Sequence, residues 1–249
     1  MMTDQHLATV RKWYANATTT SYAVDQLLSV VEKELHLKAH QLMHADSICC
    51  DDVNAIQYPA RAHDMLGPFN MGGLNGFPFA GLTGMNAFAH HVPEDGAVFI
   101  FYAPHIGITK EGSLGEIHRI GQNTASACCG AAKAALANLL KDEIKEDNIT
   151  ELDYQFNTIE QIFLKQSGRI KSAQHKIFEA TEVMYEAIDN RMQELVSKTD
   201  YPCKYVLMIG AILINGDSDM GSYCSFKRFE YIELETGERH SLLDACYEE

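Results

Sequence analysis

The spacing of apolar residues predicts a long amphipathic helix near the start of the chain. In SYAVDQLLSVVEKELHLKAHQLM, which begins at Ser21, apolar side chains return every three or four positions. Such spacing gathers them on one face of a helix, so we expect this face to pack on the body of the protein. Residues 158–197 show the same periodicity and predict one or two further helices with a core-facing side.

Three apolar runs predict strands. The run GAVFIFYAPHIGI follows turn-forming residues at 93–96 and reaches Pro104, a pattern typical of a central strand buried on both faces. His105 comes just past the end of that predicted strand. Near the C-terminus, KYVLMIGAILING and SFKRFEYIELE flank the turn-like GDSDMGS, and together they predict a hairpin.

The middle of the chain holds a glycine-rich stretch and another predicted helix. GPFNMGGLNGFPFAGLTGMNAFAHH has no clear helical or strand period, so we expect a shaped loop. SACCGAAKAALANLLKDEI predicts a helix with Ser126 as its N-cap, which puts Cys128 and Cys129 in the first turn. No repeat or linker divides the chain, so residues 1–249 are expected to form one α/β domain, a central sheet with flanking helices.

The composition is that of a globular protein with an acidic balance. Of 249 residues, 46% are hydrophobic and 22% charged, and the formal net charge is −14. This charge repels phosphate backbones and anionic lipid heads, so we expect no nucleic-acid or membrane partner and favour a small-molecule substrate. The sequence lacks a run of about 18 uncharged apolar residues and the regions of a signal peptide, which predicts a cytoplasmic location.

The seven cysteines form an odd set that includes two adjacent pairs, Cys49 with Cys50 and Cys128 with Cys129. A chain of this length does not need disulfides for stability, so we expect the paired thiols to serve a metal or a reaction. The remaining three are expected to be small buried hydrophobes: Cys203, Cys224 and Cys246.

Three potential metal ligands lie at the ends of predicted helices or strands. They are Cys49, His105, which follows the apolar strand, and Cys129, at the start of a predicted helix. Sites in open parallel α/β sheets form beyond the carboxyl ends of the strands, where helix N-termini also point, so these side chains are expected to converge. Two thiolates and an imidazole suit zinc, and three protein ligands leave a fourth position for water. A cysteine nucleophile with a histidine base would use the same residue types, and either member of each cysteine pair fits both interpretations.

Four motifs resemble those of a known protein family. CCDDVN, GGLNGFPFAGLTG followed by FAHHVP, APHIGI, and GQ with ACCGAA closely resemble the LCIB family in residues, order and separation. This family is named for a limiting-CO2-inducible protein of algal carbon concentration. It is similar to β-carbonic anhydrases in fold and zinc site and is sometimes called the θ class. The resemblance covers roughly residues 47–139.

The resemblance implies a Zn2+ site with Cys49, His105 and Cys129 as ligands. It further implies hydration of CO2 to bicarbonate by a zinc-bound hydroxide, in a homodimer with a fold similar to β-carbonic anhydrases. Asp51 becomes the acidic partner, which either orients the hydroxide or occupies the fourth metal position. The first arrangement is active and the second is closed.

One position departs from the β-carbonic anhydrase pattern. Those enzymes commonly carry an arginine two residues after this aspartate, which keeps it off the metal, whereas this chain has Val53. Arg61 is the nearest downstream candidate for that role, and its alternative is an ordinary surface position. Gln122, in the GQ pair, is expected to donate a hydrogen bond near the substrate.

Other residues of the glycine-rich stretch have two interpretations each. Phe77, Phe79 and Leu82 are expected either to wall a CO2 pocket or to pack on the chain's own core or on a second subunit. His90 and His91 are expected to line the loop or pass protons rather than bind the metal.

Two other functions remain open: a catalytically silent zinc-binding member of the family, and a metal-free thiol hydrolase.

Overall fold

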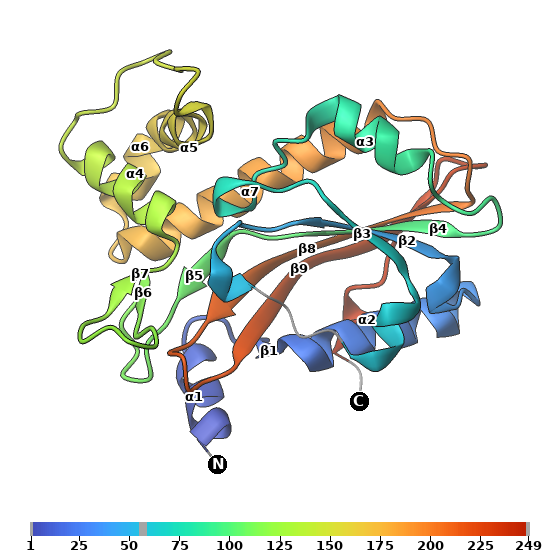
Figure 1. Cartoon of the computed structure of the whole chain (residues 1–249), viewed down its shortest axis with the longest axis horizontal. Helices are drawn as coiled ribbons and strands as arrows, with labels where there is room; N and C mark the ends of the chain where they lie inside the picture. The colour runs from blue at the N-terminus through green and yellow to red at the C-terminus, as the bar shows by residue number, and fades with distance from the viewer. Residues whose placement is uncertain (1, 55–58, 248–249) are drawn as a thin grey trace.

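The computed structural model describes residues 2–54 and 59–247, and within them one large sheet carries helices on both faces (Figure 1). The sheet order is β1-β9-β8-β4-β2-β3, with β10 beside β9 and β5 beside β8. Its strands are β1 (Thr18–Thr19), β2 (Leu42–Ser47), β3 (Leu66–Asn70), β4 (Ala97–Tyr102), β5 (His105–Gly107), β8 (Tyr205–Asn215), β9 (Ser222–Glu233) and β10 (Arg239–Ser241). A separate small sheet pairs β6 (Glu116–Ile117) with β7 (Ser126–Ala127).

Apart from α1 (Met2–Val10), which lies by itself near the N-terminus, the α-helices lie in three groups (Figure 1). They are α2 (Thr20–Leu35), α3 (Gly81–Ala89), α4 (Gly130–Leu140), α5 (Tyr154–Lys165), α6 (Ser167–Ser172) and α7 (Lys176–Ser197). Figure 1 shows α3 and α7 on one face of the sheet, α2 on the opposite face, and α4, α5 and α6 together at one end. No helix in the described ranges has the length and apolar character needed to cross a membrane.

The middle strands are parallel and buried on both sides. β2 pairs with β3 and β4, and β4 pairs with β8, all in parallel, while β9 joins β8 antiparallel. All six residues of β4 are buried, and alternate ones enter different cores: Ile100 packs under α7, and Phe101 packs under α2. Such double burial explains why the sequence here is a continuous apolar run.

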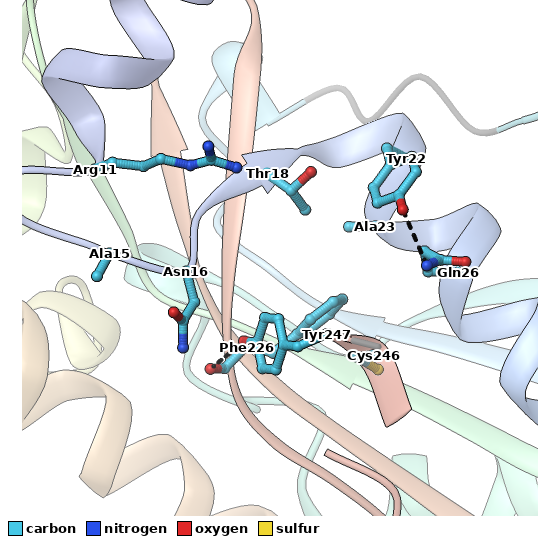
Figure 2. A pocket seen from close by; sticks show the side chains of 10 residues that line it. All are labelled: Arg11, Ala15, Asn16, Thr18, Tyr22, Ala23, Gln26, Phe226, Cys246 and Tyr247. Carbon is cyan, nitrogen blue, oxygen red and sulfur yellow. Dashed lines mark hydrogen bonds between the residues drawn. The ribbon is translucent and has the colours of Figure 1, made fainter. Parts of the chain in front are cut away.

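A cavity of about 310 Å³ opens on the α2 face, between residues 11–26 and the segments that carry Phe226 and Tyr247 (Figure 2). Arg11, Tyr22 and Gln26 line one side of it, and Phe226 and Tyr247 line the other. The Gln26 amide donates a hydrogen bond of 3.0 Å to the Tyr22 hydroxyl. Phe226 belongs to the apolar core under α2, so this cavity lies on the opposite side of the sheet from α7.

The fold confirms the predicted α/β class and several predicted elements. The first amphipathic segment forms α2, the central apolar run forms β4 and β5, and the C-terminal runs form the antiparallel pair β8 and β9. Two expectations were wrong in detail. The fully described segment 154–197 forms three helices rather than one or two, and the glycine-rich stretch includes β3 and α3 besides its loop. Burial of Met85 and Phe88 stabilises α3 despite its glycines.

Helix α4 begins later than the sequence predicts. Gly130 is its first residue and Cys129 occupies the N-cap position, so Ser126 does not cap it. Ser126 instead belongs to β7, which pairs with β6. The N–H of Cys128 then donates to the Gly115 carbonyl at 3.0 Å. These bonds hold the segment before the helix extended.

A buried ionic contact joins α7 to the sheet. Asp189 of α7 accepts a hydrogen bond of 2.6 Å from the Tyr102 hydroxyl at the end of β4. The Arg228 guanidinium of β9 donates to both oxygens of the same carboxylate, at 2.7 and 2.9 Å. Since Asp189 is only 8% exposed, these donors replace the water that it loses on burial.

Asp189→Ala is expected to lower the free energy of unfolding by about 2 kcal/mol, because it leaves Arg228 and Tyr102 without their shared acceptor. Urea denaturation followed by circular dichroism measures the change. Asp200→Ala, at an exposed position, is the control and should shift stability by less than about 0.5 kcal/mol. Equal stability of the two variants would show that the contact does not hold α7 on the sheet.

Candidate metal centre

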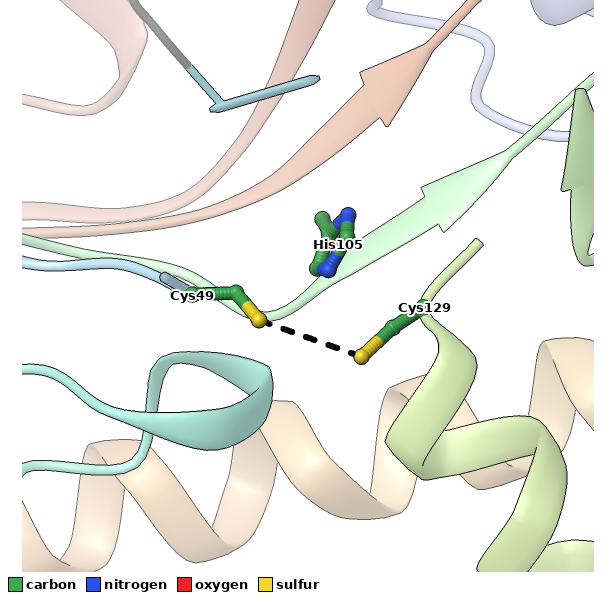
Figure 3. Close-up of side chains that lie close together, drawn as sticks. All are labelled: Cys49, His105 and Cys129. Carbon is green, nitrogen blue, oxygen red and sulfur yellow. Dashed lines mark hydrogen bonds between the residues drawn. The ribbon is translucent and has the colours of Figure 1, made fainter. Parts of the chain in front are cut away.

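Three side chains from separate segments converge at one end of the parallel strands (Figure 3). Cys49 follows β2, His105 opens β5, and Cys129 immediately precedes α4. One ligand atom from each lies within 4.8 Å of the other two. All three residues are buried, with exposed fractions of 5%, 1% and 2% respectively. The convergence expected from their strand-end and helix-start positions therefore occurs.

The spacing of the two thiols suits a tetrahedral metal ion. The sulfur atoms of Cys49 and Cys129 are 3.9 Å apart. Two sulfurs each about 2.3 Å from a tetrahedral zinc would be separated by about 3.8 Å. The donor set of two thiols and one imidazole therefore fits zinc in both chemistry and distance.

The imidazole of His105 has one nitrogen engaged and one free. Its Nδ1 lies 2.8 Å from Oδ1 of Asn215, the last residue of β8, and an amide oxygen only accepts, so Nδ1 carries the proton. Nε2 is buried and has no hydrogen-bond partner among the described residues. The lone pair of Nε2 is thus available to a metal, in the usual arrangement in which a second residue fixes the tautomer of a ligating histidine.

Asn215 is itself fixed from the other side. Its Nδ2 donates a hydrogen bond of 3.0 Å to the carbonyl of Val53, in the segment that follows Cys49. The parallel pairing of β5 with β8 aligns Gly107 with Asn215, which brings this amide beside the histidine. Sequence reasoning missed Asn215, although a polar residue ending a long apolar strand was an available signal.

The hydrogen bond between the two thiols shifts their pKa values in opposite directions. The hydrogen bond to Cys129 and burial raise the pKa of the Cys49 thiol to about 12. The same hydrogen bond, with donors at the start of α4, lowers the pKa of Cys129. Cys49 is therefore protonated at neutral pH and a poor nucleophile, and metal binding must displace its proton.

Cys128 lies on the other side of the histidine ring from the free nitrogen. Its sulfur is 3.6 Å from Nδ1 of His105 and 3.5 Å from Oδ1 of Asn215. Cys128, His105 and Asp51 form a second group whose potential ligand atoms lie within 4.8 Å of one another. Because Nδ1 is already bonded to Asn215, this second group offers a metal a poorer set than the first. Cys50, the other neighbouring cysteine, is exposed.

An arginine holds Asp51 beside the cluster. Nη2 of Arg119 lies 3.0 and 3.1 Å from the two carboxylate oxygens of Asp51, and Nη1 contacts Asp52 at 2.6 Å. Burial raises the pKa of Asp51, but the hydrogen bond with Asp52 and the positive charge of Arg119 outweigh it and lower the pKa overall. Asp51 is therefore ionised and acts as an acceptor.

Arg61 does not contact Asp51. Its guanidinium lies against α2, with Nε 2.8 Å from the Asp25 carboxylate and Nη1 3.7 Å from that of Glu32. The pairing expected of Arg61 is made by Arg119 instead, 68 residues beyond Asp51 in the chain. Proximity in sequence was the wrong guide, and the position of Arg119 between the APHIGI and ACCGAA motifs was the available signal.

The remaining polar candidates lie on the surface. Gln122 is exposed, and its backbone N–H donates to the Arg119 carbonyl at 3.2 Å, so it closes the turn that carries the arginine. His90 and His91 are exposed at the end of α3, where Nδ1 of His91 lies 2.7 Å from the Ala87 carbonyl. The hydrogen bond from Gln122 to the substrate stays a prediction, and so does proton transfer by His90 and His91.

The aromatic residues of the glycine-rich loop pack mainly on the chain itself. Phe77 is 6% exposed within the core under α7, its ring is 5.0 Å from that of Phe79, and the Arg191 guanidinium lies over it at 5.4 Å. Leu82 is 41% exposed. Of the two interpretations, core packing holds for Phe77, and a role of this wall in admitting CO2 stays a prediction.

Comparison with known proteins identifies the family. The sequence matches the family described as limiting CO2-inducible proteins B/C beta carbonic anhydrases over residues 18–233. The chain belongs to this family, which confirms the resemblance of the motifs. A search of curated proteins found no match.

Solved structures of the same family share the fold. The crystal structure of PtLCIB4, a homolog of the limiting CO2-inducible protein LCIB, is 26% identical, with 94% of this chain and 98% of that chain covered and a TM-score of 0.81. A point mutant of PtLCIB4 is 24% identical over 96% and 99% of the chains, with a TM-score of 0.83. LCIB itself is 19% identical over 92% and 95%, with a TM-score of 0.68, a likeness of fold.

The cluster predicts which substitutions remove the metal. Purified protein is expected to carry about one zinc per chain, and Cys49→Ser, His105→Ala or Cys129→Ser should each lose most of it, since two protein ligands make a weak site. Cys50→Ser and Cys128→Ser are the matched controls and should keep it. Inductively coupled plasma mass spectrometry measures the content, and full retention in Cys129→Ser would refute the ligand set.

Proposed function

We propose that this protein is a zinc-dependent carbonic anhydrase that interconverts CO2 and bicarbonate. The observation that carries the proposal is the buried cluster of Cys49, His105 and Cys129, with an ionised Asp51 held beside it by Arg119. Membership of a family described as beta carbonic anhydrases supports the same reaction. Both the activity and the zinc are part of the proposal.

The chemistry needs a water molecule that attacks the carbon of CO2 at neutral pH. Cys49, His105 and Cys129 would hold a zinc ion, which would supply this nucleophile by lowering the pKa of a water bound to it toward 7. The new carbon–oxygen bond gives bicarbonate, and one proton leaves to the solvent. Burial of the ligands makes the site dry, which strengthens each electrostatic interaction within it.

Asp51 orients the attacking water in this proposal. Its carboxylate lies within 4.8 Å of a His105 ring nitrogen and of the Cys128 sulfur, so it borders the cluster. Because its pKa is lowered, the carboxylate accepts a hydrogen bond and does not compete as a donor. The two contacts from Arg119 fix its plane and occupy lone pairs that would otherwise be free to bind the metal.

A catalytically silent relative with Asp51 on the metal is the second candidate. The closeness of the Asp51 carboxylate to a His105 ring nitrogen, within 4.8 Å, favours it. The ion pair with Arg119 opposes this arrangement. The two candidates predict opposite effects for one substitution.

A homodimer and a cytoplasmic location complete the proposal. The apolar loop suggested the dimer, but the burial of Phe77 within the chain's own core removes part of that reason. Leu82 remains as an exposed apolar side chain of this loop.

Asp51→Ala should keep the zinc and lose most CO2 hydration, at least about tenfold, because the water is no longer oriented. Stopped-flow hydration of CO2 at pH 7, on protein of measured zinc content, tests this. Higher activity in the variant would support the closed, silent form. Undiminished activity with full zinc would show that Asp51 is dispensable.

The two arginines provide a matched comparison. Arg119→Ala should lower the rate of CO2 hydration about 10- to 100-fold, because the carboxylate of Asp51 loses the partner that aims it. Arg61→Ala, which removes a contact with α2, should leave the rate within about twofold of wild type. The same stopped-flow assay measures both, and equal losses in the two variants would contradict the assignment of Arg119.

A further inference from the structure

Asn75 lies in the loop between β3 and α3 and contacts two of the three candidate ligands. Its backbone N–H donates to the Cys49 sulfur at 3.1 Å, and its side-chain Oδ1 accepts from the backbone N–H of His105 at 3.4 Å. The residue is completely buried. Asn75 is therefore held between the segments that carry Cys49 and His105, by its backbone N–H on one side and its carboxamide oxygen on the other.

The backbone of this loop is tightly confined. A Cβ on Gly72 would lie 2.2 Å from the Ile48 carbonyl oxygen, and one on Gly76 would lie 2.1 Å from that of Ala103. The loop thus presses against the strand ends that precede both ligands. Asn75 itself is left-handed, with φ of 53°, a conformation that glycine adopts more easily. Asparagine is one of the few residues besides glycine that adopt this conformation routinely.

The orientation of the amide follows from its contact with His105. A backbone N–H only donates, so the atom facing it is the oxygen, and Nδ2 is the other end of the group. Nδ2 is buried and has no hydrogen-bond partner within residues 2–54 and 59–247. Unpaired buried donors are rare, and a ligand that supplies an acceptor is a physical reason for one.

We propose that Nδ2 of Asn75 donates a hydrogen bond to an oxygen of the bicarbonate bound at this cluster, an inference that rests on the proposed function. Bicarbonate is an anion with several acceptor oxygens, and the amide N–H of Asn75 is a donor that suits them. CO2 is a weak acceptor, and negative charge grows on its oxygens as the carbon–oxygen bond forms. The amide therefore favours the transition state and the product over CO2.

Two substitutions separate this donor from a purely positioning role. Asn75→Asp keeps Oδ1 for the His105 N–H but replaces the donor with an acceptor. Asn75→Gly removes the whole amide and relieves the left-handed backbone. Asp147→Gly is the matched control, because Asp147 is also left-handed, with φ of 56°, and exposed.

Bicarbonate is titrated into each protein loaded with cobalt in place of zinc, and binding is read from the visible absorption of the metal. The dissociation constant should rise about tenfold in Asn75→Gly and more in Asn75→Asp, and it should not change in Asp147→Gly. Metal content should stay within about 20% of wild type in all three. Wild-type affinity in Asn75→Asp, or loss of bicarbonate binding only in proportion to lost metal, would overturn the proposal.

A separate readout distinguishes this inference from the proposed function. CO2 hydration is measured on the zinc-loaded wild type alone. An inactive wild type whose bicarbonate binding depends on Asn75 would refute the activity and support the donor. An active wild type whose Asn75 variants bind bicarbonate equally well would refute the donor and leave the activity standing.

Discussion

The parallel alignment of β2, β4 and β8 is the constraint on which the candidate centre depends. Parallel strands end at the same edge, so the segments that leave β2 and β4 deliver Cys49 and His105 to one place. The continued pairing of β5 with β8 then brings Asn215 against the histidine ring. Helices cover both faces of these strands, and the three candidate ligands beyond the strand ends are buried.

Around the ligands, each polar group is controlled by a residue from a different element. Asn215 leaves Nε2 of His105 free, Cys49 and Cys129 share a hydrogen bond, and Arg119 holds the ionised carboxylate of Asp51. These contacts prepare three potential metal ligands and one nearby hydrogen-bond acceptor. Such preorganisation is what a metal-assisted attack by water requires, because the charges do not need to be rearranged during the reaction.

Periodicity and motifs predicted helices and strands whose burial shows in their own sequence. They did not predict side-chain contacts between residues that are far apart in the chain. Double burial makes β4 a continuous apolar run, and one-sided burial makes α2 amphipathic, so both were readable from the sequence. Arg119 and Asn215 act through pairings far along the chain, set by the β6–β7 hairpin region and the β5–β8 register. Arg61 was chosen for its nearness in sequence, which does not determine which cation reaches a carboxylate.

The central claim is that one metal ion is held by two sulfurs and one imidazole, and X-ray absorption at the zinc edge of the purified protein tests it most directly. The account predicts two sulfur neighbours at about 2.3 Å and one histidine nitrogen at about 2.0 Å, with a further light atom completing a tetrahedron. Three sulfur neighbours, which would bring in Cys128, or a shell without sulfur would contradict it.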